Sequence, residues 1–177
     1  MEVKLFILIL ISFAFNINMI AQKDYSDKIN QLNINGQKEG LWKENINEYW
    51  RTEIYYKNGK KNGVYKEFSI ARGELSTFGE YKNDTIIGTW YYFGDYGHLM
   101  MIQKDFSKNT FPIPSIYQAQ GYCPSKCYSI MFYPNGMKKS EGILLWDNNP
   151  ESDFTFEYGE WKYYDETGKL VRTKEFK

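Results

Sequence analysis

The chain has 177 residues, the size of one ordinary domain or of a short array of small repeats. Its 22 lysine and arginine residues balance its 22 acidic residues, so no net charge favours nucleic acid as a partner. Aromatic residues make up 19% of the chain, and since Tyr and Trp favour half-buried β-surfaces, we expect an all-β fold.

The N-terminus has the features of a secretory signal peptide. Lys4 precedes an apolar run from Leu5 to Phe15, which is shorter than the roughly 20 residues of a membrane-spanning helix. The small residue Ala21 marks an expected cleavage site, so residues 1–21 are the predicted signal peptide. An uncleaved anchor is the alternative. We therefore expect a secreted or periplasmic protein, with a polar lead segment over residues 22–33.

A glycine followed two residues later by a large aromatic residue recurs along the chain. The first three of these glycines are 23 and 25 residues apart, and the fourth follows after 71, which is close to three more periods. The four pairs are Gly40 and Trp42, Gly63 and Tyr65, Gly88 and Trp90, and Gly159 and Trp161.

Each repeat unit has the pattern of a β-hairpin. Asn58 and Gly59 favour the positive φ angles of a type I′ turn, and an alternating run follows them. A single hairpin cannot bury its apolar face, whereas hairpins stacked along one sheet can. Over residues 34–177 we therefore predict an elongated antiparallel β-meander of about five hairpins.

Period-two alternation gives each repeat unit two different faces. We expect the repeat glycine to be an ordinary strand residue on the buried face, covered by an aromatic ring from a neighbouring strand. The residue after each aromatic residue then lies on the solvated face. Three of these four residues are lysines: Lys43, Lys66, Tyr91 and Lys162.

The pattern N-G-x-K-x-G-x-[WY] resembles the MORN-repeat variant of the YwqK antitoxin-like family. The resemblance covers residues 34–98 well and 132–177 fairly, and several copies in phase are hard to obtain by chance. It implies a meander of antiparallel hairpins that serves protein or membrane association rather than catalysis. The chain departs from the pattern over about residues 99–131, which we expect to be an irregular insertion.

The insertion contains the two cysteines of the chain, Cys123 and Cys127. In an exported protein this pair is expected to form a structural disulfide that closes a short loop. A structural zinc site needs four ligands, and the chain has two cysteines and one histidine, so no metal or other cofactor is expected.

The sequence contains no recognisable reaction centre, so we expect a protein that is not an enzyme. His98 follows Asp95, but no nucleophile motif accompanies the pair, and His98 is interpreted as a turn residue. Asp147, Glu151 and Asp153 lie in a predicted acidic loop that lacks the spacing of a calcium site.

Aromatic residues on the predicted lysine face are the candidate binding residues. Either they bind a partner, or the irregular insertion folds over them and buries them. The leading hypothesis is a protein-binding or scaffold module that uses its sheet face or edge, and the alternative is an envelope- or carbohydrate-binding protein. The candidate residues are Tyr91, Phe93, Tyr164, Lys66 and Lys162.

Overall fold

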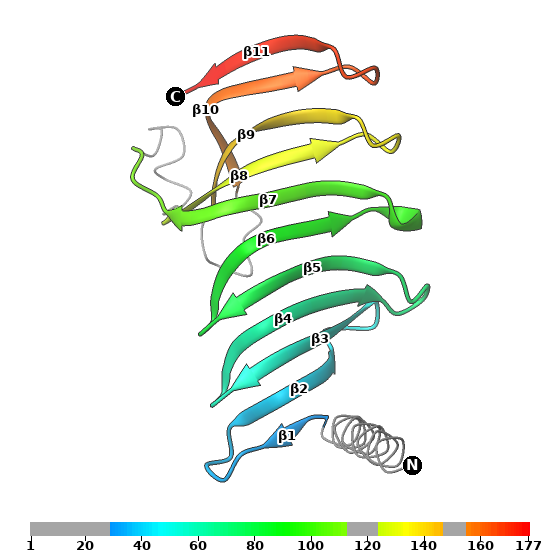
Figure 1. The fold of residues 1–177 in the computed structure, drawn as a ribbon, viewed down its shortest axis with the longest axis vertical. Coiled ribbons are helices and arrows are strands. Elements are labelled where there is room, and N and C mark those ends of the chain that lie inside the picture. The colour runs from blue at the N-terminus through cyan, green and yellow to red at the C-terminus, as the bar shows by residue number, and fades with distance from the viewer. Residues whose placement is uncertain (1–28, 113–123, 147–154) are drawn as a thin grey trace, which may run out of the picture.

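A computed structural model describes residues 29–112, 124–146 and 155–177 as one antiparallel sheet of eleven strands. The strands follow one another in chain order, so that each pairs with its sequence neighbours (Figure 1). The all-β meander is therefore confirmed. The elements are β1 (Gln31–Leu32), β2 (Lys38–Asn45), β3 (Trp50–Lys57), β4 (Lys60–Ser69), β5 (Leu75–Lys82), β6 (Thr85–Phe93), η1 (Asp95–Gly97), β7 (Leu99–Lys108), β8 (Ser125–Phe132), β9 (Lys138–Trp146), β10 (Thr155–Tyr164) and β11 (Leu170–Phe176).

The turns explain the period of about 25 residues, because two strands separate successive turns on the same side of the sheet. Asn58 and Gly59 form a two-residue turn with φ of 50° and 78°, as predicted for type I′. Asn33, Asn58 and Asn83 all lie in turns on this side, and Asn33 donates a hydrogen bond to Asn58 at 3.2 Å. Stacked turns of this kind keep the hairpins in phase.

The repeat aromatic residues lie in one row that crosses the sheet from strand to strand. We call the face that carries this row the back face and the opposite one the front face. Directly paired residues lie on the same face of a sheet, so the ladder register defines the row. From β2 to β11 it contains Trp42, Ile54, Tyr65, Gly79, Trp90, Gln103, Ser129, Gly142, Trp161 and Lys174.

The predicted backbone conformation of the repeat glycines, an ordinary strand conformation, was wrong. Gly40, Gly63, Gly88 and Gly159 all have positive φ, between 67° and 131°. At Gly63, Gly88 and Gly159 the register of the ladder shifts, because four residue steps of one strand face two steps of its partner. These glycines are therefore bulge residues. Because their φ angles are positive, a residue with a side chain at these positions would strain the backbone.

Aromatic rings do cover glycines, but different ones. The indole of Trp90 lies over Gly79 and that of Trp161 over Gly142, and both glycines are on the preceding strand. A Cβ atom at Gly79 would lie 2.2 Å from a Trp90 ring carbon, and one at Gly142 would lie 2.5 Å from Trp161. Only glycine at these positions leaves room for the rings.

The core on the back face is an aromatic cluster. Trp90 is 3% exposed, stacks on Tyr65 at 5.3 Å between ring centroids, and meets Tyr81 edge-on at 5.1 Å. Burial raises the pKa of Tyr81 to about 12. A single sheet thus gains a buried layer because large rings lie over small residues of neighbouring strands.

A smaller core lies on the front face, near the ends of β8 and β9. Leu145 and Phe156 are buried there, and Phe111 stacks on Tyr158 at 4.5 Å between ring centroids. Phe111 follows β7 in the described part of the chain, and it packs against residues of β9 and β10.

The structure changes two predicted boundaries. Within the predicted lead segment, Gln31 and Leu32 form β1 and pair with β2. Within the predicted insertion, residues 99–108 and 125–131 belong to the regular strands β7 and β8, so both boundaries of the predicted insertion were wrong. The predicted signal peptide, Cys123 and the acidic loop residues Asp147, Glu151 and Asp153 lie outside the described residues.

Candidate binding surfaces

The front face carries a row of residues that includes most of the predicted binding residues. The register pairs Lys66 with Phe78, Phe78 with Tyr91, and Tyr91 with Ile102, and the same row continues to Lys162. Apolar side chains occupy its centre, and mostly charged side chains lie on either side of them. The row contains Lys43, Glu53, Lys66, Phe78, Tyr91, Ile102, Ile130, Glu141, Lys162 and Thr173.

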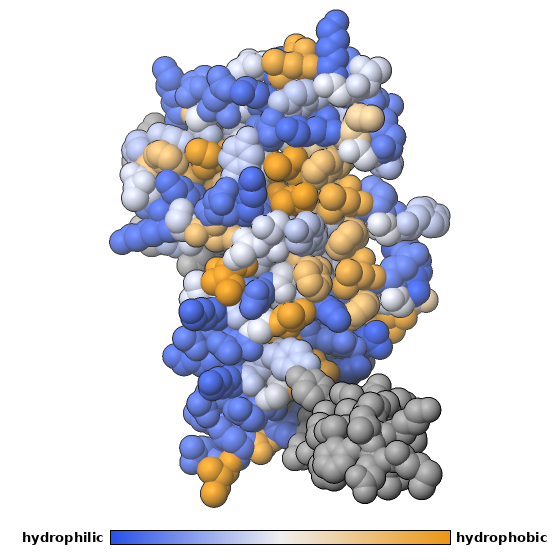
Figure 2. All heavy atoms as spheres, viewed as in Figure 1, coloured by the Kyte–Doolittle hydropathy of each residue, from blue (hydrophilic) through white to orange (hydrophobic). Residues whose placement is uncertain are grey.

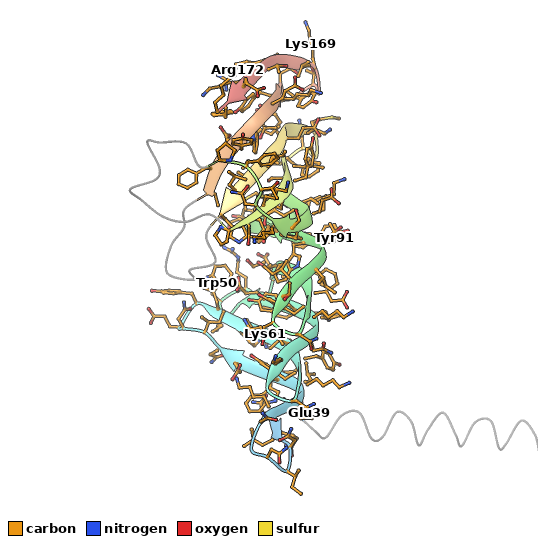
Figure 3. The ribbon with its side chains drawn as sticks, turned by 90° about the vertical axis from the view of Figure 1, so that its left-hand side faces the viewer. Glu39, Trp50, Lys61, Tyr91, Lys169 and Arg172 are labelled. Carbon is orange, nitrogen blue, oxygen red and sulfur yellow. The ribbon has the colours of Figure 1, made fainter. Side chains whose placement is uncertain are left out.

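The four central residues, Phe78, Tyr91, Ile102 and Ile130, are called the Tyr91 band here. All four are half-buried, and the rings of Phe78 and Tyr91 are 6.2 Å apart and inclined by 45°. Tyr91 projects from one side of the sheet and Trp50 from the other (Figure 3). Figure 2 shows hydrophobic residues gathered over the central strands of the front face. The band is an apolar surface between two charged ends.

Tyr164 is part of a hydrogen-bonded cluster near the turn that follows β10. Its hydroxyl donates to Glu141 at 2.6 Å, and Lys138 donates to the same carboxylate at 2.9 Å. Burial opposes the ionisation of Glu141, but the hydrogen bonds from Lys138 and Tyr164 outweigh it and lower the pKa of this carboxyl. Because the hydroxyl of Tyr164 is held in this cluster, its ring does not form a binding surface together with Tyr91.

Phe93 lies apart from the Tyr91 band, although alternation had placed it on the same face. The register shifts between Tyr92 and Phe93. Phe93 lines a small hollow of about 70 Å³ with Trp50 and Leu75, where Arg72 also forms an ion pair with Asp95. The structure therefore brings Tyr91, Lys66 and Lys162 into one row, whereas Phe93 and Tyr164 lie at other places.

His98 has a local partner in its turn. Its Nδ1 lies 2.6 Å from the carbonyl oxygen of Asp95, and its ring covers Gly94. This contact orients the imidazole towards the backbone of η1. Across residues 29–112, 124–146 and 155–177, no three His, Cys, Asp or Glu side chains come together in a group that could hold a metal ion.

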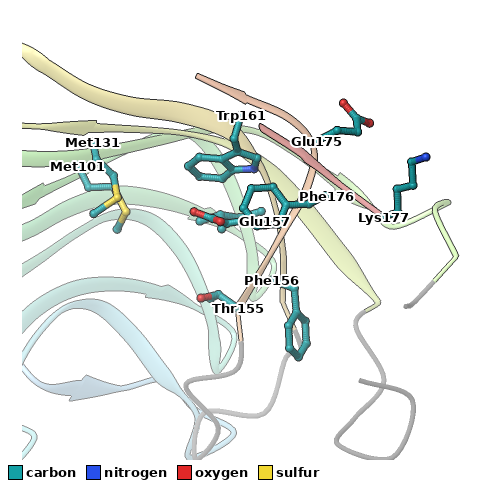
Figure 4. Close-up of a pocket in the computed structure, with 10 residues that line it drawn as sticks. Met101, Met131, Thr155, Phe156, Glu157, Trp161, Glu175, Phe176 and Lys177 are labelled. Atoms are coloured by element: carbon teal, nitrogen blue, oxygen red, sulfur yellow. The ribbon is translucent and has the colours of Figure 1, made fainter. Parts of the chain in front are cut away.

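A larger hollow, of about 640 Å³, lies on the back face between β7 and β11 (Figure 4). Met101 and Met131 face each other across the β7–β8 ladder, and Trp161 borders the hollow with its indole. The carboxylate of Glu157 also lines it and accepts a hydrogen bond from Tyr163 at 3.2 Å. The sequence did not predict this hollow, because the residues that line it lie up to 76 positions apart in the chain, from Met101 to Lys177.

The predicted disulfide between Cys123 and Cys127 is not found. Cys127 is a free cysteine that is 2% exposed, and its side chain lies on the back face of β8, opposite Leu144. Its side chain is therefore enclosed in the sheet layer rather than presented to a loop. Burial raises the pKa of its thiol to about 12.

The buried thiol leads to a chemical prediction. At pH 8 the folded protein should be alkylated by iodoacetamide at Cys127 roughly 1,000-fold more slowly than an exposed cysteine, whose pKa is about 8.5. Peptide mass spectrometry would measure this rate. In denaturant without a reducing agent, Cys127 should react fully. If it remained protected there and paired with Cys123, the free thiol would be contradicted.

Comparisons with known proteins yield no relative: no family model, no curated protein and no solved structure matches the chain. Within the described residues, the chain has no helix with the length and apolar character that a membrane span requires. The binding surfaces therefore have to be interpreted from their own geometry.

Proposed function

We propose that this chain is an exported, non-enzymatic module that binds another protein through the Tyr91 band. The observation that carries the proposal is the cross-strand row itself, in which four half-buried apolar side chains lie between charged residues. An apolar centre with a polar rim is the usual anatomy of a protein interface. The repeat pattern and its resemblance to the MORN-type family support a role in association.

The composition of the band favours a protein over a glycan. Glycan sites present flat aromatic rings on which sugars stack, whereas the rings of Phe78 and Tyr91 are inclined to each other by 45°. Ile102 and Ile130 add aliphatic side chains without hydrogen-bonding groups, and these suit apolar side chains of a partner. A glycan or another envelope component remains the alternative that the experiment below separates.

Export is part of the proposal and rests on the sequence of residues 1–21. A basic residue, a short apolar run and a small residue before the expected cleavage site support a signal peptide. The partner is then expected among secreted, periplasmic or surface proteins.

The test compares two band variants with a matched control. Ile102→Glu places a charge in the centre of the band, and Tyr91→Ala removes its largest side chain. Tyr49→Ala removes a tyrosine that is 63% exposed and lies outside the band. Loss of a central interface residue costs about 2 kcal/mol or more, so capture of the partner from the producing cell's envelope should weaken about 30-fold for the band variants only.

The outcome of the capture separates the alternatives. Elution of one protein partner that the band variants fail to retain supports the proposal, once thermal melting has shown that those variants are folded. Retention on purified envelope polysaccharide, with no protein eluted, would support the glycan alternative instead. Equal capture by all four proteins would show that the band is not the binding surface.

A further inference from the structure

The two edges of the sheet are built differently, and the edge formed by β2 is closed. The short strand β1 covers its first part. Asn30 covers the next part, since its side chain donates to the carbonyl of Lys43 at 3.0 Å and accepts from the amide of Lys43 at 2.7 Å. A side-chain amide thus takes the place of a neighbouring strand. Short edge strands and occupied backbone groups prevent the addition of another chain.

The edge formed by β11 is open in the part of the chain that the structure describes. Its seven residues pair with β10 on one side, and no described strand pairs with them on the other (Figure 1). Six of the seven residues, from Leu170 to Glu175, are exposed. A strand of this length presents a row of backbone groups that an extended segment can pair with.

Two cationic side chains, those of Arg172 and Lys174, lie on the back face of this edge. Arg172 pairs with Tyr163 in the ladder and lies 4.2 Å from the centre of its ring, and Lys174 lies 3.9 Å from the ring centre of Phe176. Figure 3 shows Arg172 on the same side of the sheet as Trp50, opposite to Tyr91. The contacts with rings hold the two charges at alternate positions of the strand, about 7 Å apart.

These charges disfavour a second copy of the chain as the occupant. Two β11 strands paired antiparallel about Thr173 would place Arg172 opposite Lys174 twice. Pairing about Arg172 places two arginines opposite each other, and pairing about Lys174 places two lysines opposite each other. Like charges directly opposite each other destabilise a sheet, so all three central registers are unfavourable.

We propose that β11 accepts an added β-strand from a partner protein, and that this strand is an extended segment with carboxylates at alternate residues. Those carboxylates would lie opposite Arg172 and Lys174 on the back face, while the backbone groups pair along the edge. This surface lies on the edge of the sheet and is independent of the Tyr91 band. The proposal therefore holds or fails separately from the proposed function.

Charge reversal provides a first test, with a matched control. K174E places a carboxylate opposite Arg172 of a second copy in the register about Thr173, so this variant should self-associate more than the wild type in sedimentation experiments. In the double variant R172E/K174E the opposing charges are alike again, and it should sediment as the wild type does. If K174E does not increase self-association, β11 is not an accessible edge and the proposal is wrong.

A peptide probe provides the decisive test. The probe is Thr-Glu-Val-Glu-Thr-Glu-Thr, acetylated and amidated, and it should slow hydrogen exchange of amides within residues 170–176 at least tenfold. R172E/K174E should bind it at least tenfold more weakly and should instead bind the matching peptide with Lys in place of Glu. Ile102→Glu should bind the Glu peptide as the wild type does, which separates this edge from the Tyr91 band.

Three results would overturn the proposal. One is equal binding of a peptide whose alternate backbone nitrogens are methylated, since such a peptide keeps its charge but cannot add as a strand. Another is protection outside residues 170–176. The third is no change in exchange at about 5 mM peptide, where even a Kd of 1 mM would give roughly 80% binding.

Discussion

Substitution of Gly79 by alanine is expected to lower the free energy of unfolding by about 2–3 kcal/mol, the upper range for an overpacked core. A Cβ atom there would lie 2.2 Å from the ring of Trp90, and no flexible group can move away, because the indole is 3% exposed and packed between Tyr65 and Tyr81. Elsewhere in a strand the same change stabilises by roughly 0.5–1 kcal/mol. Denaturant unfolding would measure both the sign and the size of the change in the free energy of unfolding.

Gly88 is the matched control for this prediction, because its backbone conformation, rather than a neighbouring side chain, disfavours other residues there. Its φ is +69° and no atom lies within 4 Å of a Cβ placed there, so the cost of alanine comes from the backbone alone, about 1–2 kcal/mol. Asparagine tolerates this φ and should restore most of the stability at Gly88, whereas asparagine at Gly79 should be more damaging than alanine. A neutral Gly79→Ala variant would contradict the covering of Gly79 by Trp90.

Trp90→Ala is expected to destabilise the protein by about 3–5 kcal/mol, the usual range for loss of a buried aromatic side chain. The melting temperature should fall by roughly 10–15 °C for a domain of this size. The reason is its position, since Trp90 contacts two aromatic rings and covers a glycine. Differential scanning calorimetry would show the shift.

Trp42 occupies the same repeat position and provides the comparison. It is only half-buried, and the ammonium group of Lys38 lies 4.5 Å from the centre of its ring. Trp42→Ala should therefore cost about 1–2 kcal/mol, within the range of ordinary substitutions. If both alanine variants lost the same free energy of unfolding, the repeat position, rather than the side chains around each tryptophan, would determine the contribution to stability.

The repeat row also relates the fold to the proposed binding surfaces. Because each repeat aromatic residue lies on the back face, the next residue in the chain points to the front face, where Tyr91 follows Trp90 and Lys66 follows Tyr65. The same alternation places Arg172 and Lys174 on the back face of β11. One register thus positions the core, the Tyr91 band and the charges of the open edge.

Several features of the candidate surface followed from local sequence. Period-two alternation placed Lys66, Tyr91 and Lys162 on the face opposite the repeat aromatic residues, and the register confirms that these three lie in one row. Phe93 does not join this row: it lies at the end of β6, where the pairing with β7 becomes irregular, and it lines a hollow with Trp50 and Leu75. Such an irregularity depends on the pairing with β7, which alternation within β6 does not contain.

The sequence by itself determined the all-β meander, because Asn-Gly turns and a period of about 25 residues are local patterns that specify hairpins in series. It also determined which aromatic residues share a row. Only the tertiary structure decided that Gly63, Gly88 and Gly159 are bulges while Gly79 and Gly142 lie beneath rings, and that Cys127 is enclosed. These features depend on which residues of different strands lie opposite each other, and that register is a property of the assembled sheet.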